Sequence, residues 1–324
     1  MRISLIIPTY KRPKTLIGTL RSLQAQIFPG FEIIVVDNAA DPELERIVQE
    51  FNKTARIPAR YIPEPELGAH HARHAGARAA RTEILAFTDD DMSFHPGWLK
   101  AYADSFAKHR EMAAAGGPSR PVWEVSPPSW LVDLMAETKD FGPLSLMEPF
   151  EEFRLAPECC FWSLNMAIRT NVLFEVGGFN PDLCGDTYLG DGEDGLVRKL
   201  RKRRQLIGYI PDAIAYHHIH RSRMTVKYLC LRMANQGAAD MYTRFHSGMD
   251  YPLGLFKCAM AIAFGNIKLW MSAVLLRGRT DIPSIRMQMH AARRCAELKY
   301  VLSLLLRRDA RQLVIKKDWL TKPG

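Results

Sequence analysis

Three short apolar runs, each followed at once by polar residues, constrain the fold of this chain more than any other feature. They are Ile3–Ile7, Glu32–Val36 and Ile84–Thr88. Compact runs of this length are typical of parallel strands buried on both faces of a sheet. Between the first two runs, leucines recur at helical spacing from Leu16 to Leu23, and Pro13 stands where the first turn of a helix tolerates it. We therefore expect an α/β sheet covered by helices.

The same alternation continues after the second run. A helix is expected around Leu44–Phe51, a short strand at Arg60–Ile62 and an alanine-rich helix at Ala69–Arg81. Repeated prolines between 116 and 157 then interrupt every candidate helix, and this predicts a loop-rich stretch that borders a cleft.

The second half of the chain changes from mixed structure to helices. A helix is expected at Glu193–Arg204 and a last short strand at Ile207–Ile210, with only helices after about residue 221. We therefore divide the chain into three parts, at residues 1–115, 116–222 and 223–324.

The composition is that of an ordinary globular protein. With 324 residues, 47% of them hydrophobic and 24% charged, the chain is long enough for one large or two modest domains. The six cysteines form no CxxC pair, so neither a zinc spacing nor a disulfide framework is indicated. The start, Met1–Pro8, fits a first strand better than a secretory signal. We expect a cytoplasmic protein.

The formal net charge of +9 hides a strong division along the chain. Residues 1–194 contain 19 basic and 28 acidic side chains, whereas residues 195–324 contain 25 basic and 7 acidic ones. A basic tail of this kind is attracted to anionic lipid headgroups, nucleic acid or a phosphorylated substrate. A solvated basic face is the simpler alternative.

One segment of this tail has the pattern of a membrane-surface helix. Residues 253–276 are mostly apolar, but Lys257 and Lys268 leave no uninterrupted run of the ~18 residues that a membrane span needs. These lysines fall in one narrow arc of a helix and leave a wide apolar face, which fits a helix lying in the membrane plane and also a helix packed on the protein. Because Tyr300–Leu306 is again apolar and then basic, we favour a peripheral protein on the inner face of a membrane.

Polar residues at the strand ends form the candidate binding site. The three apolar runs end in residues 9–12, Asp37–Asn38 and Asp89–Asp91. In open α/β sheets, ligands bind beyond the carboxyl ends of the strands. Asp37 in such a place can accept hydrogen bonds from a base or ribose, although an aspartate after a strand is also a common turn former.

Three consecutive aspartates at a strand end predict a metal site. Like charges so close repel one another unless a cationic group neutralises them, and carboxylate oxygens suit Mg²⁺ or Mn²⁺. A metal held by Asp89 or Asp91 could bridge to a diphosphate and stabilise its departure. Capping of the helix that begins near Trp98 is the alternative.

Together these motifs resemble glycosyltransferase family 2, the inverting nucleotide-sugar transferases of the GT-A fold. The resemblance covers about residues 1–240 and rests on an ordered set of motifs, namely 4–13, 33–38, 72–76, 84–91, 163–169, 175–179, 192–194 and 211–217. It implies a Rossmann-like nucleotide-binding sheet flanked by helices, followed here by a helical C-terminal region. Residues 1–115 would then bind the donor, 116–222 would hold the acceptor and the catalytic groups, and 223–324 would be the basic helical region.

The resemblance implies transfer of a sugar from a nucleoside diphosphate sugar, usually a UDP-sugar, with Mn²⁺ or Mg²⁺ as cofactor. The residues that it places at the nucleotide are Pro8, Thr9, Tyr10, Arg12, Asp37, Arg73, Asp89 and Asp90. The metal ligands that it implies are Asp91 first, then Asp89, and His217.

The resemblance also implies the groups that act on the acceptor. Inversion by direct displacement needs one base on the acceptor side of the sugar. Asp194 matches the family's base, and Glu193 would orient the acceptor or donor, but spacing alone does not rank two adjacent acids. Both also fit as favourable charges at a helix N-terminus. Trp162, Asn165 and Gly192 lie in the motifs that would line the substrate, with a buried core tryptophan as the alternative for the first.

One position departs from the family pattern, because Lys11 precedes Arg12 where an asparagine is usual. This departure leaves the identity of the donor sugar nucleotide open. We expect a glycosyltransferase of polysaccharide or cell-envelope biosynthesis that acts on a hydroxyl of a glycan or lipid-linked acceptor at an anionic membrane surface, with no nucleic-acid partner. A sugar nucleotidyltransferase is the rival enzyme, although no glycine-rich signature loop stands near the N-terminus. A non-catalytic protein that binds lipids or polyanions is the other rival.

Overall fold

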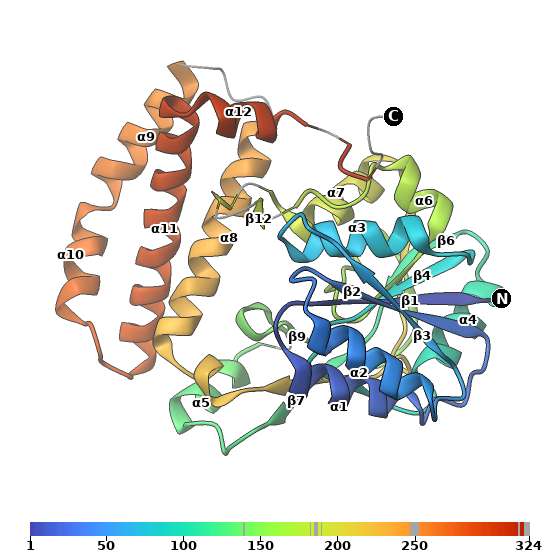
Figure 1. Ribbon diagram of the computed structural model, residues 1–324. Helices are drawn as coiled ribbons and strands as arrows, with labels where there is room; N and C mark the ends of the chain where they lie inside the picture. Colours follow the sequence, from blue (N-terminus) through green and yellow to red (C-terminus); the bar gives the residue numbers. More distant parts are fainter. Residues whose placement is uncertain are drawn as a thin grey trace.

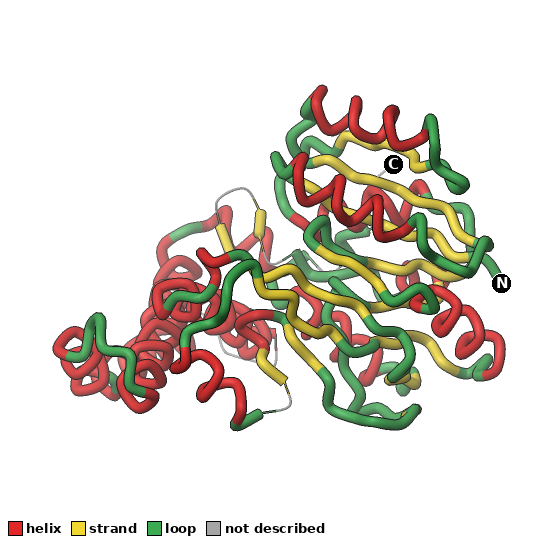
Figure 2. The backbone as a smooth tube through the Cα atoms, turned by 90° about the horizontal axis from the view of Figure 1, so that it is seen from below, coloured by secondary structure: helices red, strands yellow, loops and turns green. Residues whose placement is uncertain are grey.

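The computed structural model describes the chain except at residues 139, 182, 185, 186, 189, 247–252, 317 and 321–324. An α/β part built around sheets lies beside a layer of long helices formed by the C-terminal region (Figure 1). The view from below shows the same two parts, one with strands and helices together and the other made of the long C-terminal helices (Figure 2). The expected fold class, a sheet flanked by helices with a helical C-terminal region, is confirmed.

An eight-stranded sheet forms the centre of the α/β part. Its strands lie in the order β10 (Arg154–Leu155), β14 (Leu206–Tyr209), β6 (Met112–Gly116), β11 (Met166–Arg169), β4 (Ile84–Phe87), β1 (Ile3–Thr9), β2 (Phe31–Asp37) and β3 (Ala59–Pro63). β1 is parallel to both β2 and β4, and β2 is parallel to β3. Thr9 is the register partner of Asp37, and Ile6 is the partner of Phe87. The three strands predicted from the apolar runs therefore end at one edge of the sheet.

Helices cover both faces of this sheet. One face carries α1 (Pro13–Leu23), α2 (Pro42–Asn52) and α4 (Trp98–Lys108), and the other carries α3 (Ala69–Ala79), α6 (Thr170–Glu175) and α7 (Gly192–Lys202). Successive residues of β1 alternate between the two cores, with Leu5 facing α1 and Ile6 facing α3. Burial on both faces explains why the strands are apolar throughout.

A five-stranded sheet and short elements complete the α/β part. The strands of the sheet lie in the order β5 (Met92–Phe94), β15 (Ala215–Ile219), β7 (Ser119–Trp123), β9 (Leu146–Met147) and β8 (Asp140–Phe141). The short elements are α5 (Ser129–Ala136), η1 (Gly142–Leu144) and a hairpin of β12 (Leu183–Cys184) and β13 (Thr187–Tyr188). The expectation that Ile207–Ile210 is the last strand is wrong, because β15 follows it. In β15, Ala215, His217 and Ile219 are buried and alternate with more exposed residues.

The expected boundary at residue 115 falls inside a strand. β6 continues to Gly116, and β10, β11 and β14 come from the expected second part yet lie in the same sheet as β1. The first two parts therefore share one hydrophobic core on each face of the sheet.

The C-terminal region is helical, as expected. It contains η2 (Arg221–Arg223), α8 (Val226–His246), α9 (Leu253–Gly265), α10 (Ile267–Leu275), α11 (Ile282–Leu306) and α12 (Arg308–Val314). A separate apolar core joins α8, α9, α11 and α12. No single helix in the described part of the chain is long and apolar enough to cross a membrane, whereas α9 and α10, bent by 45° at their junction, reach that length and composition together.

The chain returns to the α/β part after α12. Leu320 is fully buried in the core on the α3 face of the large sheet. The backbone N–H of Trp319 donates to the carbonyl of Gly177 at 3.2 Å, and Arg78 Nη1 donates to the carbonyl of Leu320 at 3.2 Å. The last described residues thus fasten the helical layer to the sheet.

Candidate active site

The segments that follow β1, β2 and β4 border a cavity of about 360 Å³. Seven of the eight residues expected at the nucleotide line it, namely Pro8, Thr9, Tyr10, Arg12, Arg73, Asp89 and Asp90. They come from three separate stretches of the chain, which the parallel strands bring together. The cavity also meets Gly68, the residue before α3, so cationic side chains and a helix N-terminus face one space. This combination suits an anionic ligand.

Asp37 does not line this cavity. Its side chain is 0% exposed, and its oxygens accept hydrogen bonds from the backbone N–H groups of Ala39 (2.8 Å) and Asp41 (2.7 Å) and from the hydroxyl of Tyr61 (2.8 Å). Burial and this carboxylate raise the pKa of Tyr61, which keeps the hydroxyl protonated as a donor. Asp37 therefore orders the turn after β2, and its neighbour Asn38 reaches the cavity.

The departure at Lys11 has a conformational counterpart. Lys11 has φ of 53°, in the left-handed region that asparagine tolerates better than most residues. The asparagine usual in the resemblance thus suits this backbone. The Lys11 ammonium lies 5.2 Å from the centre of the Tyr10 ring, beside the cavity.

Each of the three consecutive aspartates is paired with an arginine. The pairs are Asp89 with Arg73 at 2.6 Å, Asp90 with Arg12 at 3.2 Å and Asp91 with Arg223 at 2.7 Å. Because the chain itself supplies three guanidinium groups, a metal ion is not needed to keep these carboxylates together. These arginines supply the cationic groups that three adjacent carboxylates require, and the metal site stays a prediction.

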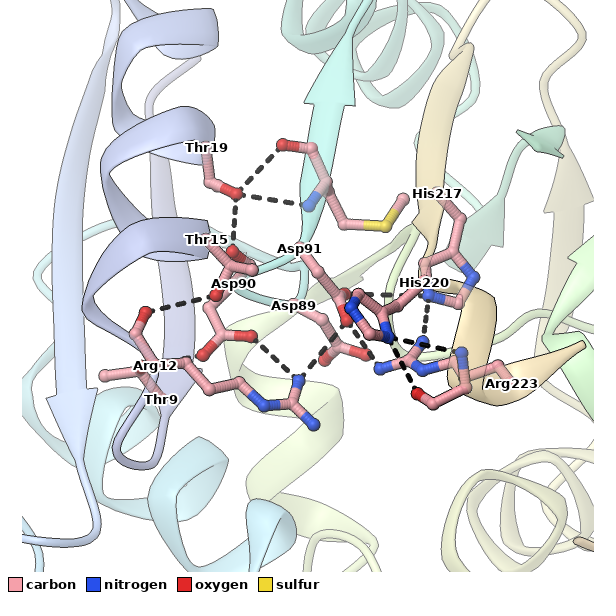
Figure 3. Close-up of polar contacts among 12 residues, drawn as sticks. Thr9, Arg12, Thr15, Thr19, Asp89, Asp90, Asp91, His217, His220 and Arg223 are labelled. Carbon is pink, nitrogen blue, oxygen red and sulfur yellow. Dashed lines mark hydrogen bonds and ion pairs between the residues drawn. The ribbon is translucent and has the colours of Figure 1, made fainter. Parts of the chain in front are cut away.

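Asp90 is buried behind the residues at the end of β1. Thr9 Oγ1 donates to Asp90 Oδ2 at 2.7 Å, and Thr19 of α1 donates to the Asp90 carbonyl at 2.8 Å (Figure 3). Burial, followed by the neighbouring charge of Asp91, raises the pKa of Asp90 to about 6. Asp90 therefore joins β1 and α1 to the turn after β4.

Asp91, in the turn between β4 and β5, faces His217 of the neighbouring strand β15. Asp91 Oδ1 lies 3.6 Å from His217 Nε2, and this oxygen has no hydrogen-bond partner within the described residues although it is buried. Burial by itself raises the pKa of Asp91, but the neighbouring His217, followed by the guanidinium groups of Arg223 and Arg12, outweighs it and holds that pKa below its usual range. Asp91 is thus a carboxylate with one oxygen left to bind a cation.

This pair fits a divalent metal better than Asp89 does. A carboxylate oxygen and an imidazole nitrogen are ligands that Mn²⁺ accepts. Asp89, the other acid expected to bind metal, is instead paired with Arg73. Across the residues that the structure describes, no group of three His, Cys, Asp or Glu side chains is arranged to hold a metal ion. Asp91 and His217 would therefore hold the metal, with further ligands from the substrate.

Glu193 lies in the first turn of α7 and is held by neighbouring groups. Its Oε1 accepts hydrogen bonds from the hydroxyl and the backbone N–H of Ser163, and its Oε2 is 3.7 Å from His70 Nε2. Burial raises the pKa of Glu193, but His70 and Arg73 outweigh it and hold the pKa well below its usual range. Arg73, which pairs with Asp89 at the cavity, thus also acts electrostatically on Glu193.

Asp194 is less constrained. Its Oδ2 accepts a hydrogen bond from Gln236 of α8 at 3.2 Å. Burial raises the pKa of Asp194, and the charge of Glu193 adds to this effect. Asp194 is therefore a partly buried carboxylate with an elevated pKa, which is the property expected of a general base.

The three expected substrate residues lie in different surroundings. Trp162 is partly buried against the core of the large sheet, and its Nε1 has no hydrogen-bond partner in the described part of the chain. Asn165 is 1% exposed. Its Oδ1 accepts hydrogen bonds from the side chains of Trp98 and Tyr102, and its Nδ2 donates to two backbone carbonyls. Asn165 thus belongs to the core rather than to a substrate wall.

Gly192 determines where α7 begins. It has φ of 48°, a left-handed conformation that glycine adopts without strain, and its N–H donates to the carbonyl of Asn180 at 2.9 Å. This turn puts Glu193 and Asp194 in the first turn of the helix.

Sequence reasoning missed four residues of this site: His70, Ser163, Arg223 and Gln236. Each reaches an acidic group from a distant part of the chain, and only Ser163 lies within a quoted motif. The dense histidines and arginines between 217 and 223 were the one available signal for Arg223.

The fold defines the class of protein. A mannosyltransferase from Pyrobaculum calidifontis, PcManGT in complex with GDP-Man and Mn²⁺, matches 97% of this chain and 83% of its own with a TM-score of 0.56 and 18% identity. GalNAc-T7 with UDP, GalNAc and Mn²⁺ matches 67% of this chain and 43% of its own, with a TM-score of 0.51 and 16% identity. The protein has the GT-A fold of glycosyltransferases.

Sequence similarity then gives the family. Residues 4–168 match glycosyl transferase family 2, and the chain belongs to that family. The glucosyl-dolichyl phosphate glucuronosyltransferase of Haloferax volcanii is 24% identical over 249 residues, which cover 73% of this chain and 75% of that protein. The resemblance is confirmed, the protein is a glycosyltransferase, and the nucleotidyltransferase and non-catalytic alternatives are set aside.

Proposed function

We propose that this glycosyltransferase takes its sugar from a nucleoside diphosphate sugar, a UDP-sugar in the first instance, and transfers it with inversion. The observation that carries the proposal is the cavity lined by Arg12 and Arg73 beside Asp89 and Asp90. The two structural neighbours are complexes with GDP-Man and with UDP, and this supports a nucleotide donor.

Two arginines are suited to the donor's phosphates. Arg73 is 4% exposed and already oriented by Asp89, so it loses little conformational entropy on binding. Arg12 is half exposed and can turn from Asp90 towards a phosphate. A Mn²⁺ or Mg²⁺ ion held by Asp91 and His217 would stabilise the negative charge of the departing diphosphate.

Asp194 is proposed as the general base. It would accept the proton of the acceptor hydroxyl while the new glycosidic bond forms and the diphosphate leaves from the opposite face. Its raised pKa favours proton uptake, and Gln236 orients the carboxylate. Glu193, held by Ser163, is proposed to fix the start of α7, which carries Asp194.

The acceptor is proposed to be a glycan or a lipid-linked hydroxyl, the second being supported by the glucosyl-dolichyl phosphate in the name of the Haloferax relative. Within this scheme, residues 1–115 bind the donor, 116–222 hold the acceptor and catalytic groups, and 223–324 dock the enzyme at the membrane.

The direct test is a screen of nucleotide sugars, each with Mn²⁺, Mg²⁺ or EDTA, in which release of the nucleotide is measured. We expect release from at least one UDP-sugar, stimulated by one of the two metals. Release of nucleotide from GDP-sugars alone would show that the donor is a GDP-sugar. Equal release in EDTA would show that the reaction needs no divalent metal.

We also propose that α9 and α10 dock on an anionic membrane surface. Their exposed apolar residues recur every three or four positions across the bend: Leu253, Phe256, Met260, Phe264, Ile267, Met271 and Val274. This apolar stripe lies on the outermost helices of the helical layer (Figure 1). The exposed residues Lys257, Lys268, Arg277 and Arg279 accompany it, and this charge favours anionic lipid headgroups, as at the inner face of a membrane.

Vesicle sedimentation tests this docking. The protein should pellet with phosphatidylserine-containing vesicles and much less with pure phosphatidylcholine, and Phe264→Glu with Met271→Glu should release it. Ile27→Glu, at an exposed apolar residue of the α/β part, is the matched control. Point variants are better than removing the tail, because Leu320 is buried against the sheet. A dimer that these variants dissociate, without vesicle binding, would identify a second copy as the occupant.

A further inference from the structure

Arg223 bridges the two side chains that fit a metal. It is the last residue of η2, and its side chain is 17% exposed. Nη2 donates to Asp91 Oδ2 at 2.7 Å, and Nη1 lies 2.6 Å from His217 Nε2 (Figure 3). One guanidinium group thus joins the acid of the first sheet edge to the histidine of β15.

The hydrogen bonds determine the tautomer of His217. Its Nδ1 lies 2.9 Å from the carbonyl oxygen of Leu144, which can only accept, so Nδ1 carries the proton. A guanidinium group can only donate, so Nε2 must accept from Arg223. Both contacts therefore require a neutral imidazole whose lone pair is on Nε2.

That single lone pair is where two cations compete. A metal bound by His217 must take the Nε2 lone pair, because Nδ1 is committed to Leu144. An imidazole nitrogen has one lone pair, so it cannot bind a metal and accept from Arg223 at the same time. Asp91 presents its unpartnered Oδ1 to the same space.

We propose that Arg223 is a built-in counter-cation, which neutralises the Asp91–His217 pair until a divalent metal displaces it. This inference deepens the proposed function and rests on its metal site. Arg12 Nη1 lies 3.3 Å from Asp91 Oδ2, so in the absence of a donor the acid keeps one cationic neighbour when Arg223 leaves.

Arg223 lies just before the helix that contacts the proposed base. Two residues separate Arg223 from Val226, the first residue of α8. α8 carries Gln236, which donates to Asp194. Arg223 and the helix that carries the partner of the proposed base are thus neighbours along the chain.

The test measures Mn²⁺ binding to the full-length protein without any donor, by calorimetry and by the EPR signal of free Mn²⁺. Arg223→Gln removes the competing charge and should bind Mn²⁺ at least about tenfold more tightly than the unchanged protein, since two charge-assisted hydrogen bonds no longer have to break. Arg221→Gln, an exposed neighbour in η2, is the matched control for loss of one positive charge. A further His217→Gln substitution should abolish the gain.

The proposal would be overturned if Arg223→Gln bound Mn²⁺ no more tightly than the unchanged protein, or if Arg221→Gln gained as much affinity. Absence of Mn²⁺ binding by both proteins would overturn it as well. Should Arg223→Gln fail to fold, Arg223→Lys replaces it, and an intermediate gain is expected because one ammonium nitrogen replaces the two-armed fork. Because this measurement needs no sugar nucleotide, its result is independent of the donor screen.

Discussion

Glu193 and Asp194 are adjacent in the first turn of α7, yet their carboxylates differ in partners and in acidity. Ser163 and His70 hold Glu193, whose pKa is lowered, whereas Asp194 accepts from Gln236 and has a raised pKa. Sequence spacing could not rank these two acids. Their surroundings favour Asp194 as the group that exchanges a proton.

The first prediction separates catalysis from donor binding. Asp194→Asn should lower kcat by at least ~100-fold while the affinity for the sugar nucleotide stays nearly unchanged, because a base acts in the transition state. With a raised pKa, the active base form of Asp194 is lost at a higher pH than for an ordinary aspartate, so kcat should fall on the acidic side.

Steady-state kinetics and a donor-binding titration measure these effects. Asp104→Asn, at an exposed aspartate of α4, is the control and should leave both constants unchanged. Weaker donor binding with normal kcat in Asp194→Asn would contradict the assignment.

The second prediction concerns Asp90 and pH. Its folded pKa of about 6 is above the ordinary value of 3.8, so the folded protein binds more protons than the unfolded chain between these values. The contribution of Asp90 to the free energy of unfolding therefore decreases as pH rises through this range. Asp90→Asn removes the dependence, so its stability relative to the unchanged protein should rise by about 2 kcal/mol between pH 4 and pH 7.

Urea unfolding at several pH values gives these free energies. Asp133→Asn, at an exposed aspartate of α5, controls for loss of a carboxylate. A difference between Asp90→Asn and the unchanged protein that stays constant with pH would show that Asp90 is not held in this way.

The third prediction tests Asn165 as a core residue. Asn165→Ala leaves buried groups of Trp98 and Tyr102 and two backbone carbonyls without their partner. Each unsatisfied group costs about 1–3 kcal/mol, so we expect at least about 3 kcal/mol of destabilisation in urea unfolding. Asn171→Ala, at an exposed asparagine of α6, should change stability by less than about 0.5 kcal/mol. Normal stability of Asn165→Ala with lost donor binding would restore the substrate role.

The sequence predicted the parts of the molecule that depend on local pattern. The strands from Ile3, Ile33 and Ile84 and their common edge followed from apolar runs, because burial on both faces requires continuous hydrophobicity. β15 was missed because its alternation includes His217, a polar residue that is buried. Buried polar residues are the usual exception to reading strands from hydropathy.

The ion pairs of the site could not be predicted, because they depend on distant residues. Three aspartates in a row indicated a cation, and the sequence offered a metal, yet Arg12, Arg73 and Arg223 supply the charge. More than 60 residues separate Arg12 from Arg73 along the chain, and Arg223 lies further still from both. Only the assembled sheets bring them to one edge.

The final prediction concerns the end of the chain. Leu320 is fully buried beside α3, in the core that covers one face of the large sheet, so the tail stabilises the α/β part as well as the helical layer. Leu320→Ala should lower the free energy of unfolding by about 2–5 kcal/mol, the range for truncating a buried leucine. Leu306→Ala, 81% exposed at the end of α11, should cost less than about 0.5 kcal/mol. Equal urea midpoints for the two variants would mean that the tail does not dock on the sheet in solution.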